Sequence, residues 1–193
     1  MPQLPDVSLD LGHGLTLGPL ALEDAPVIFE AVEDAELRRW LPLPRPYPIE
    51  LAEAWCTTMT RDIRESGDGI VRAVRQDGQM VANISVKRID WRARVGEIGY
   101  WTARDARGRG VMTAAVVGLS DWLLGEMAFE RVELRIAPGN GASHRVAEKA
   151  GFTYEGLARN AGFTDSGRVD LAVYSLVPAD LRGSSRAAIV ASP

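Results

Sequence analysis

The chain has 193 residues, a formal net charge of −4 at pH 7 and a single cysteine, Cys56. This length suffices for one domain with a sizeable core, and one cysteine excludes an internal disulfide. The mildly acidic balance argues against a broad nucleic-acid-binding surface, and no apolar run approaches the length of a membrane span. We expect a cytoplasmic protein without a metal site, because the N-terminus lacks a signal pattern and the two histidines and Cys56 have no metal-ligand spacing.

The first half of the chain is expected to form a strand, two helices and a hairpin. The strand covers residues 15–20, the helices cover 23–36 and about 49–64, and the proline-rich residues 41–48 between them are extended. Residues 70–89 carry the clearest signal, two β-rich runs on either side of Asp77-Gly78, which predicts a hairpin.

The second half is expected to alternate strands and helices. Strands are predicted over 93–101, 130–137, 153–164 and 168–177, with one helix ending near Leu124 and another capped near Asn140. This order predicts an α/β (α+β) protein whose mixed sheet is covered by helices. We expect an N-terminal segment over 1–12, one domain over 13–179 and a C-terminal tail over 180–193, of which residues 182–193 are mobile.

The stretch RGRGVMTAA, residues 107–115, lies between a predicted strand and a predicted helix. Glycines let a ligand approach the backbone, and free N–H groups at a helix start favour an anion. The two familiar nucleotide patterns are absent, because no Gly-Lys-Ser/Thr follows and Thr113 stands where a dinucleotide fingerprint has its third glycine. The stretch is therefore either a solvated turn or a binding site for a phosphate-bearing ligand.

Three motifs in this order resemble the GNAT superfamily of acyl-CoA-dependent N-acyltransferases, in particular its RimJ/RimL-like branch. They are EIGYW (97–101), RGRGVMTAA (107–115) and NGASHRVAEKAGFTYEG (140–156). The resemblance covers roughly residues 15–179. It implies the GNAT fold, in which a mixed, mostly antiparallel sheet is splayed between two strands and flanked by about four helices.

The resemblance also implies acetyl-CoA as co-substrate. Arg107 and Gly110 match the family's phosphate loop, although Met112 stands where a small residue is usual. The loop amides would bind the pyrophosphate, with Arg107 and Arg109 near its phosphates, and the pantetheine arm would insert between residues 97–102 and 131–137. The implied cofactor-binding residues are Tyr100, Trp101, Thr102, Arg107, Gly108, Arg109, Gly110, Val111, Met112, Thr113, Asn140 and Ser143.

Two residues are candidates for catalysis. Glu97 would accept the proton of the attacking amine through water, or it would simply pair with an arginine such as Arg135. Many family members have a tyrosine where this chain has Ala147, so Ser143 is the nearest substitute to serve the leaving thiolate. A tyrosine introduced at Ala147 would raise turnover if the phenol fits.

Several functions remain open. The leading one is transfer of the acetyl group from acetyl-CoA to a primary amine, either a protein N-terminus or a small molecule. The alternatives are an acyltransferase for a longer acyl-CoA such as succinyl-CoA, which would need a cation beyond the thioester, and a non-catalytic acyl-CoA-binding regulatory module. Acetylation of charged tRNA is disfavoured by the acidic balance. A homodimer is left open.

Overall fold

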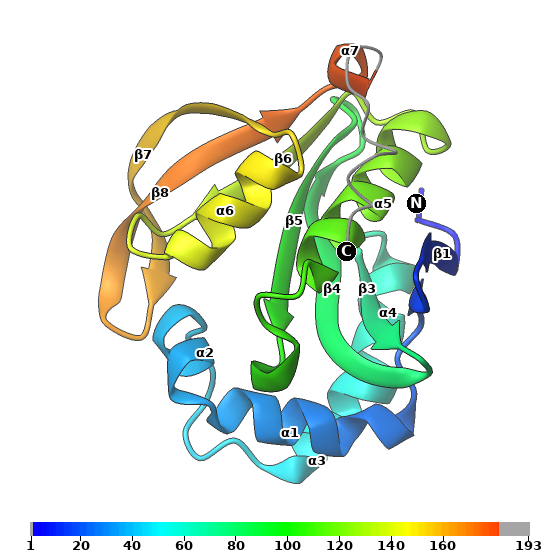
Figure 1. Ribbon diagram of the computed structural model, residues 1–193, viewed down its shortest axis with the longest axis vertical. Helices are drawn as coiled ribbons and strands as arrows, with labels where there is room; N and C mark the ends of the chain where they lie inside the picture. The colour runs from blue at the N-terminus through cyan, green and yellow to red at the C-terminus, as the bar shows by residue number, and fades with distance from the viewer. Residues whose placement is uncertain (1, 182–193) are drawn as a thin grey trace.

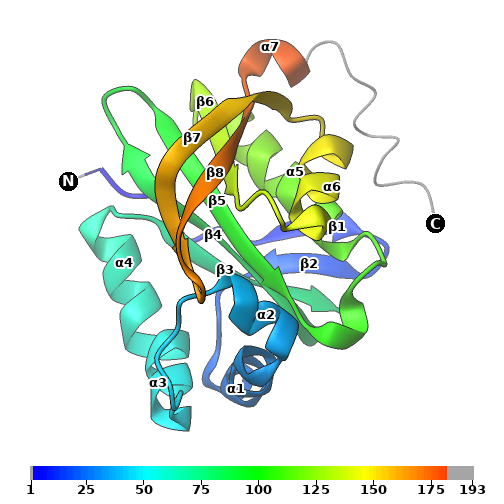
Figure 2. The same cartoon turned by 90° about the vertical axis from the view of Figure 1, so that its left-hand side faces the viewer.

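The computed structural model describes residues 2–181, whose strands form one mixed sheet with helices on both faces (Figure 1, Figure 2). The strands are β1 Leu9–Gly12, β2 Leu15–Gly18, β3 Ile70–Gln76, β4 Gln79–Asp90, β5 Val95–Thr102, β6 Arg131–Ile136, β7 Thr153–Thr164 and β8 Gly167–Leu176. Their order in the sheet is β1-β2-β3-β4-β5-β6-β8-β7, and only β5 and β6 pair in parallel. The expected mixed, mostly antiparallel sheet is confirmed.

The helices are α1 Ala25–Glu33, α2 Ala35–Trp40, α3 Ile49–Ala54, α4 Thr60–Ser66, α5 Val111–Gly125, α6 Gly141–Lys149 and α7 Pro178–Leu181. Helices α1 to α4 pack on one face of the sheet, where Ala73 and Trp101 join their apolar cluster. Helix α5 packs on the other face, against Ile84 and Ile98. The described residues thus contain more helices than the four expected, because two predicted helices are each divided in two and the short α7 follows β8.

The predicted helix over 23–36 is wrong as a single element. The helix is interrupted at Asp34, where the backbone is extended (φ −66°, ψ 125°). The Asp34 side chain accepts a hydrogen bond from the N–H of Leu37 at 3.1 Å. Asp34 therefore caps a new helix, α2, in place of continuing α1. The predicted helix over 49–64 is present, with a π-helical turn at Trp55–Met59 between α3 and α4.

The sheet begins earlier in the chain than expected, within the segment assigned to residues 1–12. Strand β1 pairs antiparallel with β2, and Leu11 is buried against α5. A Cβ at Gly118 of α5 would overlap the Leu11 side chain, so the glycine allows this close approach. The expected mobile residues 182–193 lie outside the described residues.

The central sheet opens between β5 and β6 (Figure 1). The two strands pair only from Val95–Arg131 to Glu97–Glu133. Beyond that point β5 continues to pair with β4, and β6 continues to pair with β8, so one edge of each strand is left without a neighbour. The splay predicted between residues 97–102 and 131–137 is therefore confirmed.

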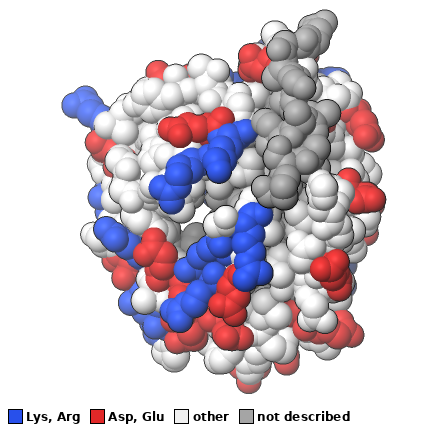
Figure 3. Space-filling view, viewed as in Figure 1, with Lys and Arg blue, Asp and Glu red and all other residues white. Residues whose placement is uncertain are grey.

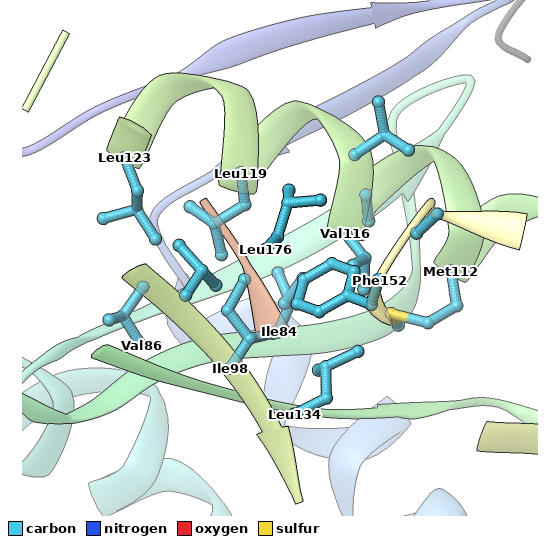
Figure 4. Packing of buried hydrophobic residues seen from close by; sticks show 14 of the residues in the cluster. Ile84, Val86, Ile98, Met112, Val116, Leu119, Leu123, Leu134, Phe152 and Leu176 are labelled. Carbon is cyan, nitrogen blue, oxygen red and sulfur yellow. The ribbon is translucent and has the colours of Figure 1, made fainter. Parts of the chain in front are cut away.

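The main core lies between this sheet and α5 (Figure 4). Eleven of the fifteen residues of α5 are buried, so the helix is apolar around most of its circumference. Met112 points into this core beside Phe152 and is only 5% exposed. The bulky side chain in the phosphate loop motif thus packs inward and leaves the surface of the loop clear.

Candidate active site

The loop before α5 has the geometry of an anion-binding site. Gly108 and Gly110 have φ values of +76° and +79°, and no atom lies within 4 Å of a Cβ built on either residue. The first hydrogen bond of the helix runs from the N–H of Ala114 to the carbonyl of Gly110 at 3.0 Å. The three N–H groups before Ala114 have no partner within the helix, so they are available to a negatively charged group. The loop therefore fits a pyrophosphate.

A pocket of about 410 Å³ extends from this loop, which is a size typical of ligand sites. The expected residues that line it are Tyr100, Trp101, Thr102, Arg107, Gly108, Gly110, Val111, Met112, Thr113, Asn140 and Ser143. Arg109 is exposed on the loop next to the pocket. Figure 3 shows Lys and Arg side chains on both sides of a hollow in this face of the molecule.

Arg107 is held by protein groups. Its Nη2 donates to Asp34 Oδ1 at 2.7 Å, and its Nε donates to the carbonyl of Thr102 at 3.0 Å. Arg104 donates to the other oxygen of Asp34 at 2.8 and 3.0 Å. The Arg107 guanidinium thus fastens the loop to the start of α2, while the residue also lines the pocket.

The Asp34 carboxylate is nearly buried and strongly hydrogen-bonded. Burial alone would raise its pKa, but the hydrogen bonds from Arg107, from the N–H of Leu37 and from Arg104 outweigh burial and lower the pKa from the ordinary value of an aspartate. Asp34 is therefore charged at neutral pH, and it joins α1, α2 and the phosphate loop through one side chain.

The first turn of α6 forms the opposite wall of the pocket. Asn140 caps the helix by accepting the N–H of Ser143 at 3.1 Å, as predicted. The hydroxyl of Tyr100 reaches across from β5 and donates to the carbonyl of Ser143 at 3.4 Å. Burial raises the pKa of Tyr100 to about 12, with partial opposition from that hydrogen bond, so the phenol stays protonated at neutral pH.

Ala147 lies one turn further along α6 and is fully buried. A tyrosine side chain there would have to displace core atoms, so the phenol does not fit. The condition under which Ala147→Tyr would raise turnover, room for the phenol, is therefore not met. The protonated Tyr100 is the tyrosine that lines the pocket.

Glu97 lies outside the pocket lining, on the face of β5 opposite Ile98. Its side chain is 8% exposed and faces three cations: Lys87 at 3.1 Å, Arg88 at 3.1 Å and Arg135 at 3.7 Å. The pairing with Arg135 is the structural alternative that the sequence left open. Any catalytic role for Glu97 must coexist with these ion pairs.

Sequence reasoning missed two walls of the pocket. One comes from α2, through Glu36, Leu37 and Trp40, and the other from the later turns of α6, through Arg145 and Lys149. The spacing of Arg145 and Lys149, four residues apart on a helix, could have indicated a shared cationic face. Nothing local in the sequence indicates that α2, more than 60 residues earlier in the chain, meets the phosphate loop.

A sequence model of the acetyltransferase (GNAT) domain family matches residues 14–153. The chain belongs to this family. The match includes the open loop, the start of α6 and the strands on either side of the split, so the GNAT domain contains every element that builds the pocket.

GNAT relatives by sequence include a protein named as a ribosomal N-acetyltransferase, YdaF of Bacillus subtilis. It is 35% identical over 116 residues, which are 60% of this chain and 63% of YdaF. YjcK, named as an N-acetyltransferase of the same organism, is 37% identical over 84 residues, which are 43% of this chain and 46% of YjcK. The matches span less than two thirds of either relative.

Solved GNAT structures show the same fold over nearly the whole chain. A crystal structure of an acetyltransferase superposes with a TM-score of 0.81 at 28% identity, covering 90% of this chain and 98% of that one. Mycobacterium smegmatis RimJ in complex with CoA-disulfide superposes with a TM-score of 0.82 at 24% identity, covering 92% and 88%. The likeness to RimJ shows the fold alone.

Two further features are plain in residues 2–181. No helix there is long and apolar enough to cross a membrane. Within the same residues, His, Cys, Asp and Glu side chains form no group of three or more that could hold a metal ion.

Proposed function

We propose that the protein transfers the acetyl group of acetyl-CoA to a primary amine in the cytoplasm. The observation that carries this proposal is the open glycine loop at the start of α5, which leads into the split between β5 and β6. The loop offers backbone N–H groups to the pyrophosphate, and the split offers free strand edges to the amides of the pantetheine arm. Membership of the GNAT family and the relatives named as N-acetyltransferases support the same activity.

The split is an opening through the sheet from one face to the other, so two substrates that bind on opposite faces can meet there. The phosphate loop and α6 line the pocket on the side from which we propose that the co-substrate enters, and α2 and Trp101 line it from the other face. Glu97 and Gly99 alternate with Ile98 and therefore point toward the other face, which carries α1 to α4. We place the amine acceptor on that second face, where it reaches the thioester carbonyl through the split.

The reaction needs a neutral amine, stabilisation of the oxyanion and departure of the thiolate. The amine nitrogen bonds to the carbonyl carbon, the bond from that carbon to sulfur breaks, and the amine proton passes to water or a base. Glu97 is the proposed base, acting through water. Ser143 is proposed to donate a hydrogen bond to the leaving sulfur, because it lines the pocket at the first turn of α6.

The placement of acetyl-CoA is tested by a pair of glycine substitutions. Gly110→Asp adds a negative charge and a side chain where the pyrophosphate must approach, so the Kd for acetyl-CoA measured by calorimetry should rise at least tenfold, or about 1.4 kcal/mol. Gly78→Asp is the matched control: it has φ +84°, lies in the β3–β4 turn and has open space around it. Equal affinities in the two variants would reject the placement.

The acceptor is proposed to be a free N-terminal amine, because the α-amine is less protonated than a lysine side chain at neutral pH. A relative named as a ribosomal N-acetyltransferase is consistent with a protein acceptor.

A homodimer is proposed on the exposed apolar residues Tyr154, Leu157 and Phe163 of the edge strand β7. Light scattering of the purified chain would show one copy or two.

A further inference from the structure

A continuous network of ion pairs lies on the sheet face opposite the phosphate loop. It joins the cations Lys87, Arg88, Arg131 and Arg135 to the carboxylates of Glu97, Glu133 and Glu155. The network begins where β5 and β6 separate, because Glu97 and Glu133 are the last residues that these strands pair. It therefore borders the split on the proposed acceptor side.

Positive charge exceeds negative charge in this network. Four cations face three carboxylates, which leaves a surplus of one positive charge. The surplus lies at the Glu97 end, since that carboxylate is shared by three cations and Glu155 at the other end is bonded by Arg131 through both oxygens. The cations around Glu97 are reachable from solvent, with Lys87 49% and Arg88 61% exposed, while Glu97 is 8% exposed.

Gly99 has no side chain, so the surface of β5 beside these cations is left uncovered. It follows Glu97 by two residues and therefore points to the same face, just beyond the last pairing between β5 and β6. A Cβ at Gly99 would lie 3.2 Å from Nζ of Lys87. The Lys87 ammonium thus extends over the strand at the opening of the split, where a larger residue at Gly99 would push it aside.

We infer that this cationic site binds a carboxylate carried by the acceptor close to its reacting amine. The inference rests on the proposed function, because it needs the acceptor to enter from this face. An acceptor carboxylate would neutralise the surplus charge, and Lys87 and Arg88 offer it charge-assisted hydrogen bonds without breaking the buried Glu97 pairs. The favoured substrate class is a peptide N-terminus followed by an acidic residue.

The experiment compares two amidated peptides that begin with serine and differ only in glutamate or glutamine at the second position. Acetyl-CoA is saturating, and release of free thiol is followed. The wild-type chain should acetylate the glutamate peptide with a KM about threefold to tenfold lower. Lys87→Met should bring the ratio of the two kcat/KM values toward one, and Lys87→Arg should preserve it. Arg92→Met is the matched control, because it removes an exposed cation that lies just after β4, in the β4–β5 connection, and outside the network.

A second arm identifies the source of the carboxylate. Succinyl-CoA replaces acetyl-CoA with the glutamine peptide, because a carboxylate at the end of the acyl group could reach the same cations. A preference for succinyl-CoA that Lys87→Met abolishes would overturn the assignment to the acceptor. Equal KM values for the two peptides would overturn the inference alone. Absence of turnover with either peptide, despite acetyl-CoA binding, would overturn both the inference and the proposed N-terminal acceptor.

Discussion

At the scale of single residues, Glu97 has two proposed roles that one substitution can separate. Glu97→Gln removes the charge and keeps the shape. If Glu97 relays the amine proton, kcat/KM should fall by roughly 10²–10⁴-fold at neutral pH, and the loss should shrink as pH rises because more of the acceptor is already neutral. The measurement is a pH profile of kcat/KM from pH 6 to 9.

The control for Glu97 is Glu133→Gln, which removes the neighbouring carboxylate of the same network. Glu133→Gln should lower the free energy of unfolding, and any loss in its kcat/KM should not depend on pH. A loss in Glu97→Gln that is the same at every pH would assign Glu97 to holding Lys87, Arg88 and Arg135 in place.

Ser143 is expected to make a modest contribution. A serine hydroxyl yields its proton reluctantly, so it can supply one hydrogen bond to the leaving sulfur, or about 1–1.5 kcal/mol. Ser143→Ala should therefore lower kcat about tenfold with saturating acetyl-CoA. The thermal melting temperature should stay unchanged, since the Asn140 cap bonds the backbone N–H of Ser143 and survives the substitution. An unaltered kcat would mean that the thiolate departs without help from Ser143.

At the scale of elements, Asp34 connects three segments, so substituting it should lower the free energy of unfolding. Asp34→Asn keeps an acceptor for the α2 cap but loses the charge that Arg104 and Arg107 share, at a cost of about 1.5–3 kcal/mol. The folded-state pKa is lowered from the ordinary value of an aspartate, so this contribution is complete above about pH 5 and is lost as pH falls through the folded-state pKa.

The measurement is urea unfolding of Asp34→Asn and of the wild-type chain at pH 7 and at acid pH. The difference in unfolding free energy between them should be largest at pH 7 and should diminish below pH 4. Asp105→Asn is the control, because Asp105 is an exposed carboxylate on the same connection between β5 and α5. A difference that persists unchanged into acid would reject the ion-pair explanation.

The elements also show which parts of the fold sequence reasoning could predict. The hairpin around Asp77-Gly78 and the cap at Asn140 were predicted correctly, because both depend on neighbours within a few residues. The break at Asp34 was not, because the favourable helix pattern continues past it and the arginines that hold its side chain lie about 70 residues later. Strand β1 was missed because four residues carry little pattern of their own.

At the scale of the whole molecule, the loop and α6 motifs predicted one wall of the pocket but not its shape. Gly110 acts through its own backbone conformation, and Asn140 acts through a side-chain hydrogen bond to a residue three positions later, so local sequence indicates both. The α2 wall, the burial of Ala147 and the cations around Glu97 depend on how distant strands and helices pack together. The spacing of residues along the sequence does not indicate these tertiary contacts.

The split between β5 and β6 also limits the shape of whatever occupies it. Two strands that stop pairing leave backbone donors and acceptors free on the edges that face each other, whereas paired strands in a sheet lie about 4.8 Å apart. A linear chain with its own amide groups can satisfy both edges, whereas a branched or bulky chain would force β6 and β8 outward together. We therefore expect the opening to select a donor by its cross-section, independently of its charge. Because both edges lie inside the sheet, a strand from another molecule should reach them less easily than it would reach the edge strands β1 and β7.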